Sequence, residues 1–371
     1  MASSRWKVPY TDFPAQFDRE RDGLIAAITS VLEKGDLILG DAVSRFEAAF
    51  GTLCGVDHAV GVGSGTDALV LALHALGIGA GDEVVTVPNS WISSASCIAL
   101  VGARPVFVDV LPDMNIDPDK IEAAITDRTK AILPVHLSGR PARMDRIASI
   151  AAAHGLVVIE DAAQAVGALF EGQAVGSLGN VGCFSLHPLK NLNACGDAGI
   201  ITCDDDSLHE KLRLLRNHGL VDRDHVDSWG FCSRLDSIQA AVLEYRLHDL
   251  AWVEARRREN ATYYTENLAD VVTTPAEGPG EHHVYHTYVI QTDQRDGLAK
   301  HLTDTGISTK VHYPVPIHLQ KPCLDLGYAK GDFPETERLC DEMLTLPAHQ
   351  FLSEAQRDLV VSEILSFFRR G

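Results

Sequence analysis

The sequence predicts an α/β fold in which a large domain with a mostly parallel central sheet precedes a smaller α+β domain. Between residues 57 and 203, short β-branched runs alternate with stretches of helical apolar spacing, a pattern that builds a parallel sheet. The chain of 371 residues also exceeds the roughly 250 to 300 residues at which single cores usually stop growing. We therefore expect a large domain over residues 1–250 and a small domain over residues 251–371.

Short apolar segments are expected to form the strands of the large domain. They are His58–Val62, Glu83–Val87, Pro105–Val110, Ala131–His136, Leu156–Glu160, Gly182–Leu186 and Gly199–Cys203. The stretches with helical spacing lie between them. They are Thr66–Leu76, Trp91–Val101, Pro118–Ile125 and Met144–Ala153. Gly77, Gly102 and Gly155 mark the ends of three of these helices, because glycine readily adopts the left-handed conformation found after a helix.

The pattern changes after residue 235. Ser237–Leu250 and Glu254–Leu268 have helical character, and Thr273–Gly280, with two Pro and two Gly, is expected to be a loop. The small domain follows with its own strands and helices. Its expected strands are Val284–Thr292 and Ser308–His312, and its expected helices are Asp296–Thr305 and Glu335–Leu344.

The chain is strongly acidic, with 32 Lys and Arg against 51 Asp and Glu and a formal net charge of −19. Such a charge repels nucleic acids and anionic membranes, so neither is expected as a partner. Met1–Phe13 lacks the apolar stretch of a secretory signal, and Ala68–Ala80 is too short to span a membrane. The eight cysteines include no Cys-x-x-Cys pair, which favours buried free thiols over a metal site or disulfides. We expect a cytoplasmic protein without a metal site.

Polar residues follow the expected strands at their carboxyl ends, where parallel sheets bind ligands. The run Gly63–Asp67 follows the first strand and offers backbone N–H groups and a hydroxyl at a helix N-terminus, as a phosphate site requires. It lacks the Gly-x-Gly-x-x-Gly spacing and the Walker lysine, so a tight structural turn is an equal alternative. Trp91 follows the second strand and is suited either to stacking on a flat ligand or to core packing.

Charged and amide side chains follow the fifth and sixth strands. Asp161 and Gln164 come after the fifth, where Asp161 is suited to bind a ligand or to cap a helix. Ser185 and Lys190 come after the sixth. Burial would lower the pKa of Lys190 and make it a nucleophile for carbonyl carbon, although a solvated surface charge is the commoner role of a lysine.

Taken together, these residues suit pyridoxal phosphate. Its phosphate needs hydroxyl and N–H groups, its ring needs a stacking face, its pyridine nitrogen needs a carboxylate, and its aldehyde needs an amine. The strand ends supply each of these groups in turn.

A longer series of motifs resembles the DegT family of nucleotide-sugar aminotransferases, which are pyridoxal phosphate enzymes of fold type I. The resemblance covers nearly the whole chain. The matching stretches are Gly40–Glu47, Ser64–Leu69, Gly81–Val84, Pro134–Leu137, Glu160–Gln164, Phe184–Ser185 with Lys190, Arg216–Gly219, Ser233–Asp236 and His312–Pro314.

The resemblance implies roles for individual residues. Lys190 and Asp161 would be catalytic, Lys190 by joining the cofactor aldehyde and Asp161 by pairing with the pyridine nitrogen. Further cofactor contacts would come from Gly65, Thr66, Trp91, Gln164 and Ser185. Substrate would be bound by His187, Arg234, His312, Tyr313 and His318, with Arg223 and Lys310 as further candidates for its negative charge.

The resemblance also implies an activity. The enzyme would move an amino group from L-glutamate, through the pyridoxamine form of the cofactor, to a keto sugar. The form Ser233–Asp236 is similar to that of relatives that aminate C3 of a nucleotide-linked deoxyhexose. Amination at C4, a sugar phosphate or cyclitol acceptor, a lyase or dehydratase reaction, and a non-catalytic regulatory role are the alternatives, and Lys190 argues against the branch of dehydratases that carries His at that position.

A homodimer with shared active sites is implied as well. Family members usually reach the partner's cofactor phosphate with an Asn that precedes the Ser-Arg-Leu-Asp run. This chain has Cys232 there, and a thiol is a weak donor. The cross-subunit contact is therefore expected to differ in this protein.

Overall fold

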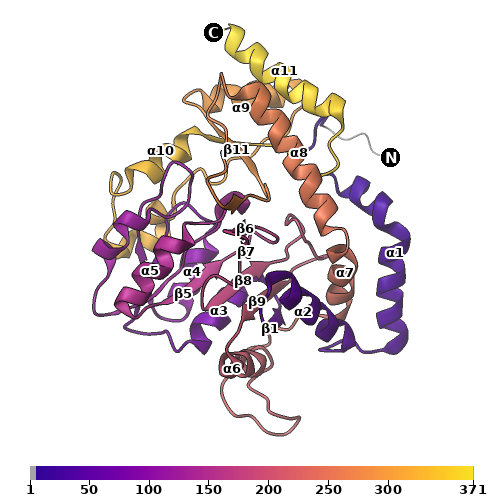
Figure 1. Ribbon diagram of the computed structural model, residues 1–371, viewed down its shortest axis with the longest axis vertical. Coiled ribbons are helices and arrows are strands. Elements are labelled where there is room, and N and C mark those ends of the chain that lie inside the picture. The colour runs from indigo at the N-terminus through magenta and orange to yellow at the C-terminus, as the bar shows by residue number, and fades with distance from the viewer. Residues whose placement is uncertain (1–5, 371) are drawn as a thin grey trace.

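The computed structural model describes residues 6–370, and its centre is a sheet of seven strands (Figure 1). Residues 1–5, part of the segment in which no secretory signal is expected, lie outside the described residues. The strands are β1 (His58–Val62), β2 (Glu83–Thr86), β3 (Arg104–Phe107), β4 (Thr129–Ile132), β5 (Val157–Asp161), β8 (Val181–Ser185) and β9 (Gly199–Cys203). Each one overlaps a predicted strand of the large domain.

The sheet is mostly parallel, as predicted. Its order is β1-β9-β8-β5-β4-β2-β3, and the strands from β8 to β3 all pair in parallel. β9 is the exception, because it runs antiparallel to both of its neighbours, β1 and β8. The parallel strands therefore bring their carboxyl ends to one edge.

Helices cover both faces of this sheet, so its strands are buried on both sides (Figure 1). Leu69, Ile98 and Ile147 belong to the larger of two buried clusters that pack against the sheet. Its helices are α3 (Gly65–Ala75), α4 (Ser93–Leu100), α5 (Met144–His154) and α6 (Asp206–Arg216). Phe46 and Leu243 belong to the second cluster. Its helices are α2 (Asp41–Cys54) and α7 (Ser237–Leu247), with α1 (Phe13–Lys34) packed outside against α7.

The C-terminal part has its own core. β11 (Tyr288–Gln291) pairs antiparallel with β12 (Met343–Leu346). Its helices are α8 (Leu250–Leu268), α9 (Arg295–Thr305), α10 (Pro334–Glu342) and α11 (Glu354–Arg370). Val8, near the N-terminus, is buried in this core and pairs with Ile307. We retain residues 251–371 as a proposed domain, to which the segment around Val8 contributes.

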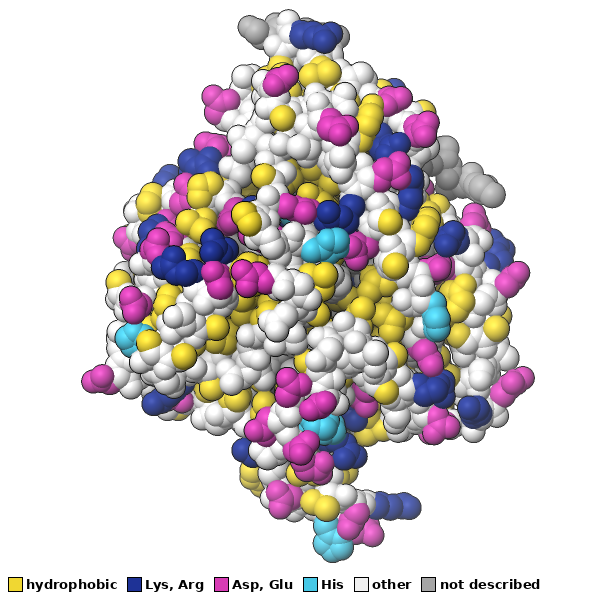
Figure 2. All heavy atoms as spheres, in the orientation of Figure 1, with side chains coloured by type: hydrophobic (Ala, Val, Ile, Leu, Met, Phe, Trp, Pro, Cys, Tyr) yellow, Lys and Arg dark blue, Asp and Glu magenta, His cyan; other side chains and the backbone are white. Residues whose placement is uncertain are grey.

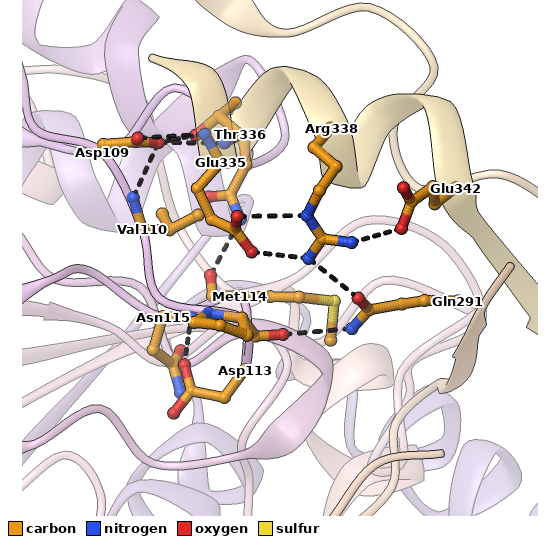
Figure 3. A network of polar contacts seen from close by, with 12 residues as sticks. Asp109, Val110, Asp113, Met114, Asn115, Gln291, Glu335, Thr336, Arg338 and Glu342 are labelled. Carbon is orange, nitrogen blue, oxygen red and sulfur yellow. Dashed lines mark hydrogen bonds and ion pairs between the residues drawn. The ribbon is translucent and has the colours of Figure 1, made fainter. Parts of the chain in front are cut away.

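A buried carboxylate joins α10 to the large domain (Figure 3). Asp109, in the loop after β3, accepts hydrogen bonds from the backbone N–H groups of Glu335 (3.1 Å) and Thr336 (2.9 Å) and from the Thr336 hydroxyl (2.9 Å). The carboxylate thus lies at the N-terminus of α10, where the helix dipole favours negative charge. Arg338, one turn further along α10, binds Glu335, Glu342 and Gln291.

Several predicted elements are wrong in detail. Pro118–Ile125 forms two short 3-10 helices, Pro118–Lys120 and Glu122–Ala124, because Asp117 caps a single tight turn. Ser308–His312 makes only one bridge, from Lys310 to Thr345. The predicted helix Glu335–Leu344 ends at Glu342, because Leu344 and Leu346 point into the small core as part of β12.

Other elements were not predicted. They are α1, α2, α6, α11, β12 and a small sheet of β6 (Leu169–Phe170), β7 (Gln173–Ala174) and β10 (Glu281–His282). α1 carries a recognisable start signal, because the side chain of Asp12 accepts a hydrogen bond from Ala15 N at 3.0 Å and Pro14 occupies the first turn.

The cysteines are free, but not all of them are buried. Six are buried, whereas Cys195 and Cys232 are exposed, which corrects the prediction for these two. Both lie in loops, away from the strand and helix interiors that bury the others. Within residues 6–370, none of the helices has the length and apolar character needed to cross a membrane.

Candidate active site

The candidate site lies at the carboxyl ends of β1, β2, β5 and β8. At the first of these ends, α3 begins at Gly65, and the side chain of Ser64 accepts a hydrogen bond from Asp67 N at 3.1 Å. Ser233 holds this turn from the other side, because its hydroxyl accepts from Gly63 N (3.1 Å) and donates to Asp67 (2.7 Å). The turn is therefore fixed in place by side chains from two distant segments.

Gly65 allows β8 to approach this turn closely. A Cβ atom at Gly65 would lie 2.6 Å from the Cβ of Ser185, a separation that real side chains do not tolerate. The Thr66 hydroxyl shares a hydrogen bond of 2.8 Å with Ser93, at the start of α4. N–H groups of a helix N-terminus and three hydroxyls thus gather in one place, which suits a phosphate.

Asp161 ends β5 as a buried carboxylate with only 4% of its surface exposed. Its Oδ2 accepts a hydrogen bond from the Ser94 hydroxyl (2.7 Å), and its Oδ1 accepts from Ala163 N (3.2 Å). Burial raises the pKa of Asp161, while the bonds from Ser94 and Ala163 and the charge of Lys190 oppose that rise. The residues that follow form a turn rather than a helix, so Asp161 caps no helix.

Lys190 lies in the loop after β8 and is close enough to Asp161 for the two charges to interact. Burial lowers the pKa of its amine to about 8, although the charge of Asp161 acts in the opposite direction. The loop is fixed on both sides of Lys190, because Asn191 donates to Val284 O (3.1 Å) and Asn193 donates to Pro188 O (2.7 Å). The unprotonated fraction of this amine near neutral pH is therefore larger than that of an ordinary lysine.

Trp91 is open rather than packed in the core, with 58% of its surface exposed. Its ring centroid lies 5.7 Å from that of Tyr313, with the ring planes at 47°. Gln164 accepts a hydrogen bond from Ser138 N at 2.7 Å and donates to the Tyr313 hydroxyl at 3.4 Å. Burial raises the pKa of Tyr313, so its phenol stays protonated. The structure thus brings Trp91, Gln164 and Tyr313 together.

His312 belongs to the same group. Its Nδ1 forms a hydrogen bond of 2.9 Å with the Thr345 hydroxyl, and its ring lies 6.0 Å from that of Tyr10. Burial, followed by the positive charges of Lys190 and Lys310, lowers the pKa of His312 to about 4. A neutral imidazole beside Lys190 can donate or accept a hydrogen bond without repelling the amine.

The remaining predicted substrate residues lie in varied surroundings. His187 is exposed, and Arg234 donates to Asn217 Oδ1 at 3.2 Å. His318 is fully buried, where it forms a 3.1 Å hydrogen bond with Glu337 and packs edge-on against Phe333. Arg223 is exposed and lies in the loop that follows α6. That loop projects from the lower end of the molecule in Figure 1.

Three residues of the site were missed by the sequence analysis. Ser94 contacts Asp161 directly, and Tyr10 packs beside His312. The third is His286, whose Nδ1 is buried without a hydrogen-bond partner and whose pKa is lowered well below its ordinary value by burial and by the charge of Lys190. Tyr10 and His286 lie outside the strand ends that guided the prediction, so only Ser94, beside Trp91, carried a usable signal.

These features define the class of the protein. The buried carboxylate of Asp161, the amine of Lys190 with its lowered pKa, the open ring of Trp91 and the close approach at Gly65 fit pyridoxal phosphate group by group. The α/β fold places them as a pyridoxal phosphate enzyme requires.

The family follows from sequence comparison. The model of the DegT/DnrJ/EryC1/StrS aminotransferase family matches residues 18–365, and this chain belongs to that family. The UDP-N-acetyl-3-dehydro-alpha-D-glucosamine 3-aminotransferase of Acidithiobacillus ferrooxidans is 44% identical over 367 residues, which are 98% of this chain and 97% of the relative. A protein of Geobacillus stearothermophilus described as a pleiotropic regulatory protein is also 44% identical over 367 residues, 98% of this chain and 99% of its own.

Solved structures agree with this assignment. DesV of S. venezuelae, solved in complex with a ketimine intermediate, matches with a TM-score of 0.96 and 41% identity over 98% of this chain and 99% of its own. NtdA of Bacillus subtilis, solved with bound pyridoxamine phosphate, matches with a TM-score of 0.91 and 32% identity over 98% of this chain and 85% of its own. The predicted family, fold class and cofactor are confirmed.

Proposed function

We propose that the protein transfers the amino group of L-glutamate to a nucleotide-linked 3-keto-deoxyhexose in amino-sugar biosynthesis. The observation that carries this proposal is the pairing of Lys190, whose pKa is lowered to about 8, with the buried carboxylate of Asp161. Perturbed groups of complementary charge at the mouth of an α/β sheet are typical of catalytic sites.

Bound pyridoxal phosphate supplies an aldehyde for covalent attachment and a ring that takes up negative charge from the reacting carbon. Lys190 would hold the aldehyde through its amine and would move a proton to and from that carbon as a general base and acid. Asp161 keeps the ring nitrogen protonated, so that charge developing near the transition state is stabilised. Loss of one such group commonly costs about 3 to 4 kcal/mol.

Other side chains orient the cofactor and the substrates. Gly65, Thr66 and Ser185 are the proposed phosphate ligands, Trp91 the stacking face and Gln164 the partner of the ring hydroxyl. His187, Arg234, His312, Tyr313 and His318 remain the proposed substrate residues. His312 and Tyr313 have the strongest support, because the charge of Lys190 acts on His312 and Gln164 donates a hydrogen bond to Tyr313.

The preference for a 3-keto sugar draws on relatives. The Acidithiobacillus relative carries a 3-aminotransferase name, and a Streptomyces venezuelae relative with 41% identity is named dTDP-3-amino-3,4,6-trideoxy-alpha-D-glucose transaminase. Amination of a 4-keto nucleotide sugar, a sugar phosphate or a cyclitol is the alternative within the same chemistry.

The test is a substrate panel. The purified protein loaded with pyridoxal phosphate is mixed with L-glutamate and 3-keto or 4-keto nucleotide sugars, and 2-oxoglutarate and amino sugar are measured by mass spectrometry. We expect product with the 3-keto sugar, and none from Lys190→Ala. Failure of every keto acceptor and amino donor would contradict the proposal, and turnover of 4-keto sugars alone would move the reaction to C4.

A regulatory role is the second candidate, because the Geobacillus relative is described as a regulatory protein. Such a role would not need the amine of Lys190. A Lys190→Ala variant that restores the phenotype of a deletion strain would support regulation, whereas a variant that fails while the wild type succeeds would support catalysis.

We further propose a homodimer with shared sites, located in the cytoplasm. Free thiols at all eight cysteines suit a reducing compartment. The exposed apolar residues of the loop beyond α6, Val221, Val226 and Trp229, suit contact with a second copy.

A further inference from the structure

Two buried serines stand behind Asp161. Ser94, in the first turn of α4, has no exposed surface, and Ser90, in the turn before α4, has 5% exposed. The Ser94 hydroxyl donates to Asp161 Oδ2 at 2.7 Å and forms a second hydrogen bond of 2.8 Å with the hydroxyl of Ser90. Because the single hydrogen of Ser94 is given to Asp161, Ser90 must be the donor in the second bond.

The direction of these bonds has an electrostatic consequence. A hydrogen bond donated to a carboxylate favours its charged form, and a donor polarised by a second hydroxyl is a stronger one. Asp161 needs this support, because its burial disfavours the charge. Ala163 N and Ser94 occupy one acceptor position on each oxygen, so positions remain for the ring nitrogen of a cofactor.

We propose that Ser90 and Ser94 form a positioning relay that keeps Asp161 ionised and fixed for its role toward the cofactor's ring nitrogen. This inference rests on the proposed function, since it requires Asp161 to serve that nitrogen. Neither serine touches the cofactor in this proposal; both act through the carboxylate.

Other groups that interact with Asp161 do not replace this relay. Lys190 attracts its charge from the loop after β8, but that amine is committed to the cofactor aldehyde. His136, in the segment after β4, is held by Ala142 N (2.9 Å) and Glu160 (3.0 Å). The remaining titratable neighbours are Cys97, Cys183 and Tyr313, and burial raises the pKa of each, so they stay neutral.

The alternative is a purely structural role, in which the serines only satisfy the first turn of α4. The two roles differ in what they do to the cofactor's spectrum. A protonated ring nitrogen lowers the proton affinity of the nitrogen that joins Lys190 to the cofactor, because like charges repel. If Asp161 loses its charge more readily, the ring nitrogen loses its proton, and the pH midpoint of the visible absorbance rises.

The experiment compares variants of the chain loaded with pyridoxal phosphate. Ser94→Ala is expected to raise the pH midpoint and to increase the dissociation constant of the cofactor about tenfold, the loss of one hydrogen bond to a charged group. Ser90→Ala is expected to shift both quantities in the same direction by less. Ser94→Thr, which keeps the hydroxyl, and Ser96→Ala, on the same helix but partly exposed, are expected to match the wild type.

Thermal unfolding of the apoproteins separates this effect from a loss of folding. A Ser94→Ala variant that is less stable but keeps the wild-type midpoint would overturn the relay in favour of a structural role. The Asp161→Asn variant tests the role of Asp161 separately from that of the two serines. If Asp161→Asn shifts the midpoint and Ser94→Ala does not, the relay alone is wrong; if Asp161→Asn has wild-type values, the role of Asp161 in the proposed function fails and the relay with it.

Discussion

At the scale of single residues, the absence of one methyl group shapes the candidate phosphate site. Gly65 begins α3 where Ser185 ends β8, and the space between them cannot hold a Cβ atom. The helix N-terminus and the serine hydroxyl therefore lie as close together as the backbone allows. The turn after β1 and the hydroxyl of Ser185 are each weak evidence for a phosphate site when taken alone. Their close approach makes them parts of one anion site.

We predict that Gly65→Ala weakens cofactor binding at least tenfold. The new methyl group would meet Ser185 Cβ at 2.6 Å, so α3 or β8 must shift, and overpacking of this kind typically costs about 1 to 3 kcal/mol. The dissociation constant of pyridoxal phosphate, measured by absorbance titration, checks this. Gly79→Ala is the matched control, because its nearest neighbour lies at an ordinary 3.4 Å; equal affinities for the two variants would show that the close approach is unimportant.

At the scale of elements, the C-terminal part is attached to the sheet through a helix end. Asp109 satisfies backbone donors of α10 that have no partner within the helix, and it does so from the loop that follows β3 (Figure 3). Burial raises the pKa of Asp109, but the hydrogen bonds from Thr336, Val110 and Glu335 outweigh it, so the net change is a lowering. A lowered pKa in the folded state means that the charged carboxylate stabilises the fold.

We predict that Asp109→Asn lowers the free energy of unfolding by about 1 to 2 kcal/mol at pH 7, because the amide removes the charge and leaves only one of the two oxygens that accept from Glu335 and Thr336. The contribution of Asp109 is present above the unfolded pKa of about 3.9 and is lost as the pH falls through the lower folded value. The difference between variant and wild type should therefore shrink below about pH 4. Urea unfolding across this range measures it. Asp119→Asn removes an exposed partner of Arg146 and should change little; a similar loss in both variants would argue against a special role for Asp109.

The elements also differ in how well the sequence predicts them. The strands of the central sheet were predictable, because burial on both faces makes each one a continuous apolar run such as Val157–Ile159. The site at their ends was predicted from topology, since Asp161 ends one such run and Lys190 lies in the loop that follows another. Tyr10 and His286 were not predicted as site residues, because neither follows a strand of the central sheet: Tyr10 precedes α1, and His286 lies in the C-terminal segment Val284–Thr292 that was predicted as a strand. β12 was missed because Met343–Leu346 continues the helical pattern of α10.

At the scale of the whole molecule, charge and apolar surface are distributed differently. Acidic and basic side chains are interspersed over the face in Figure 2, so the net charge of −19 is spread rather than gathered into one patch there. Large apolar residues are exposed on the projecting loop between α6 and α7, where Trp229 has 95% of its surface in solvent. A tryptophan this open on a projection is unfavourable in an isolated chain and is typical of a contact surface.

We predict that Trp229→Asp weakens self-association at least tenfold. Central aromatic residues of an interface commonly contribute about 2 kcal/mol or more, and a carboxylate in their place must be desolvated to form the same contact. Sedimentation velocity across a range of protein concentrations should show wild-type dimers at concentrations where the variant is a monomer. Leu100→Asp, an exposed apolar residue at the end of α4 with 68% of its surface open, is the control for added charge and should stay dimeric.

Because the proposed sites are shared between subunits, the activity of Trp229→Asp should fall at low protein concentration and recover as the concentration rises. A variant that is monomeric yet fully active at every concentration would show that each chain completes its own site.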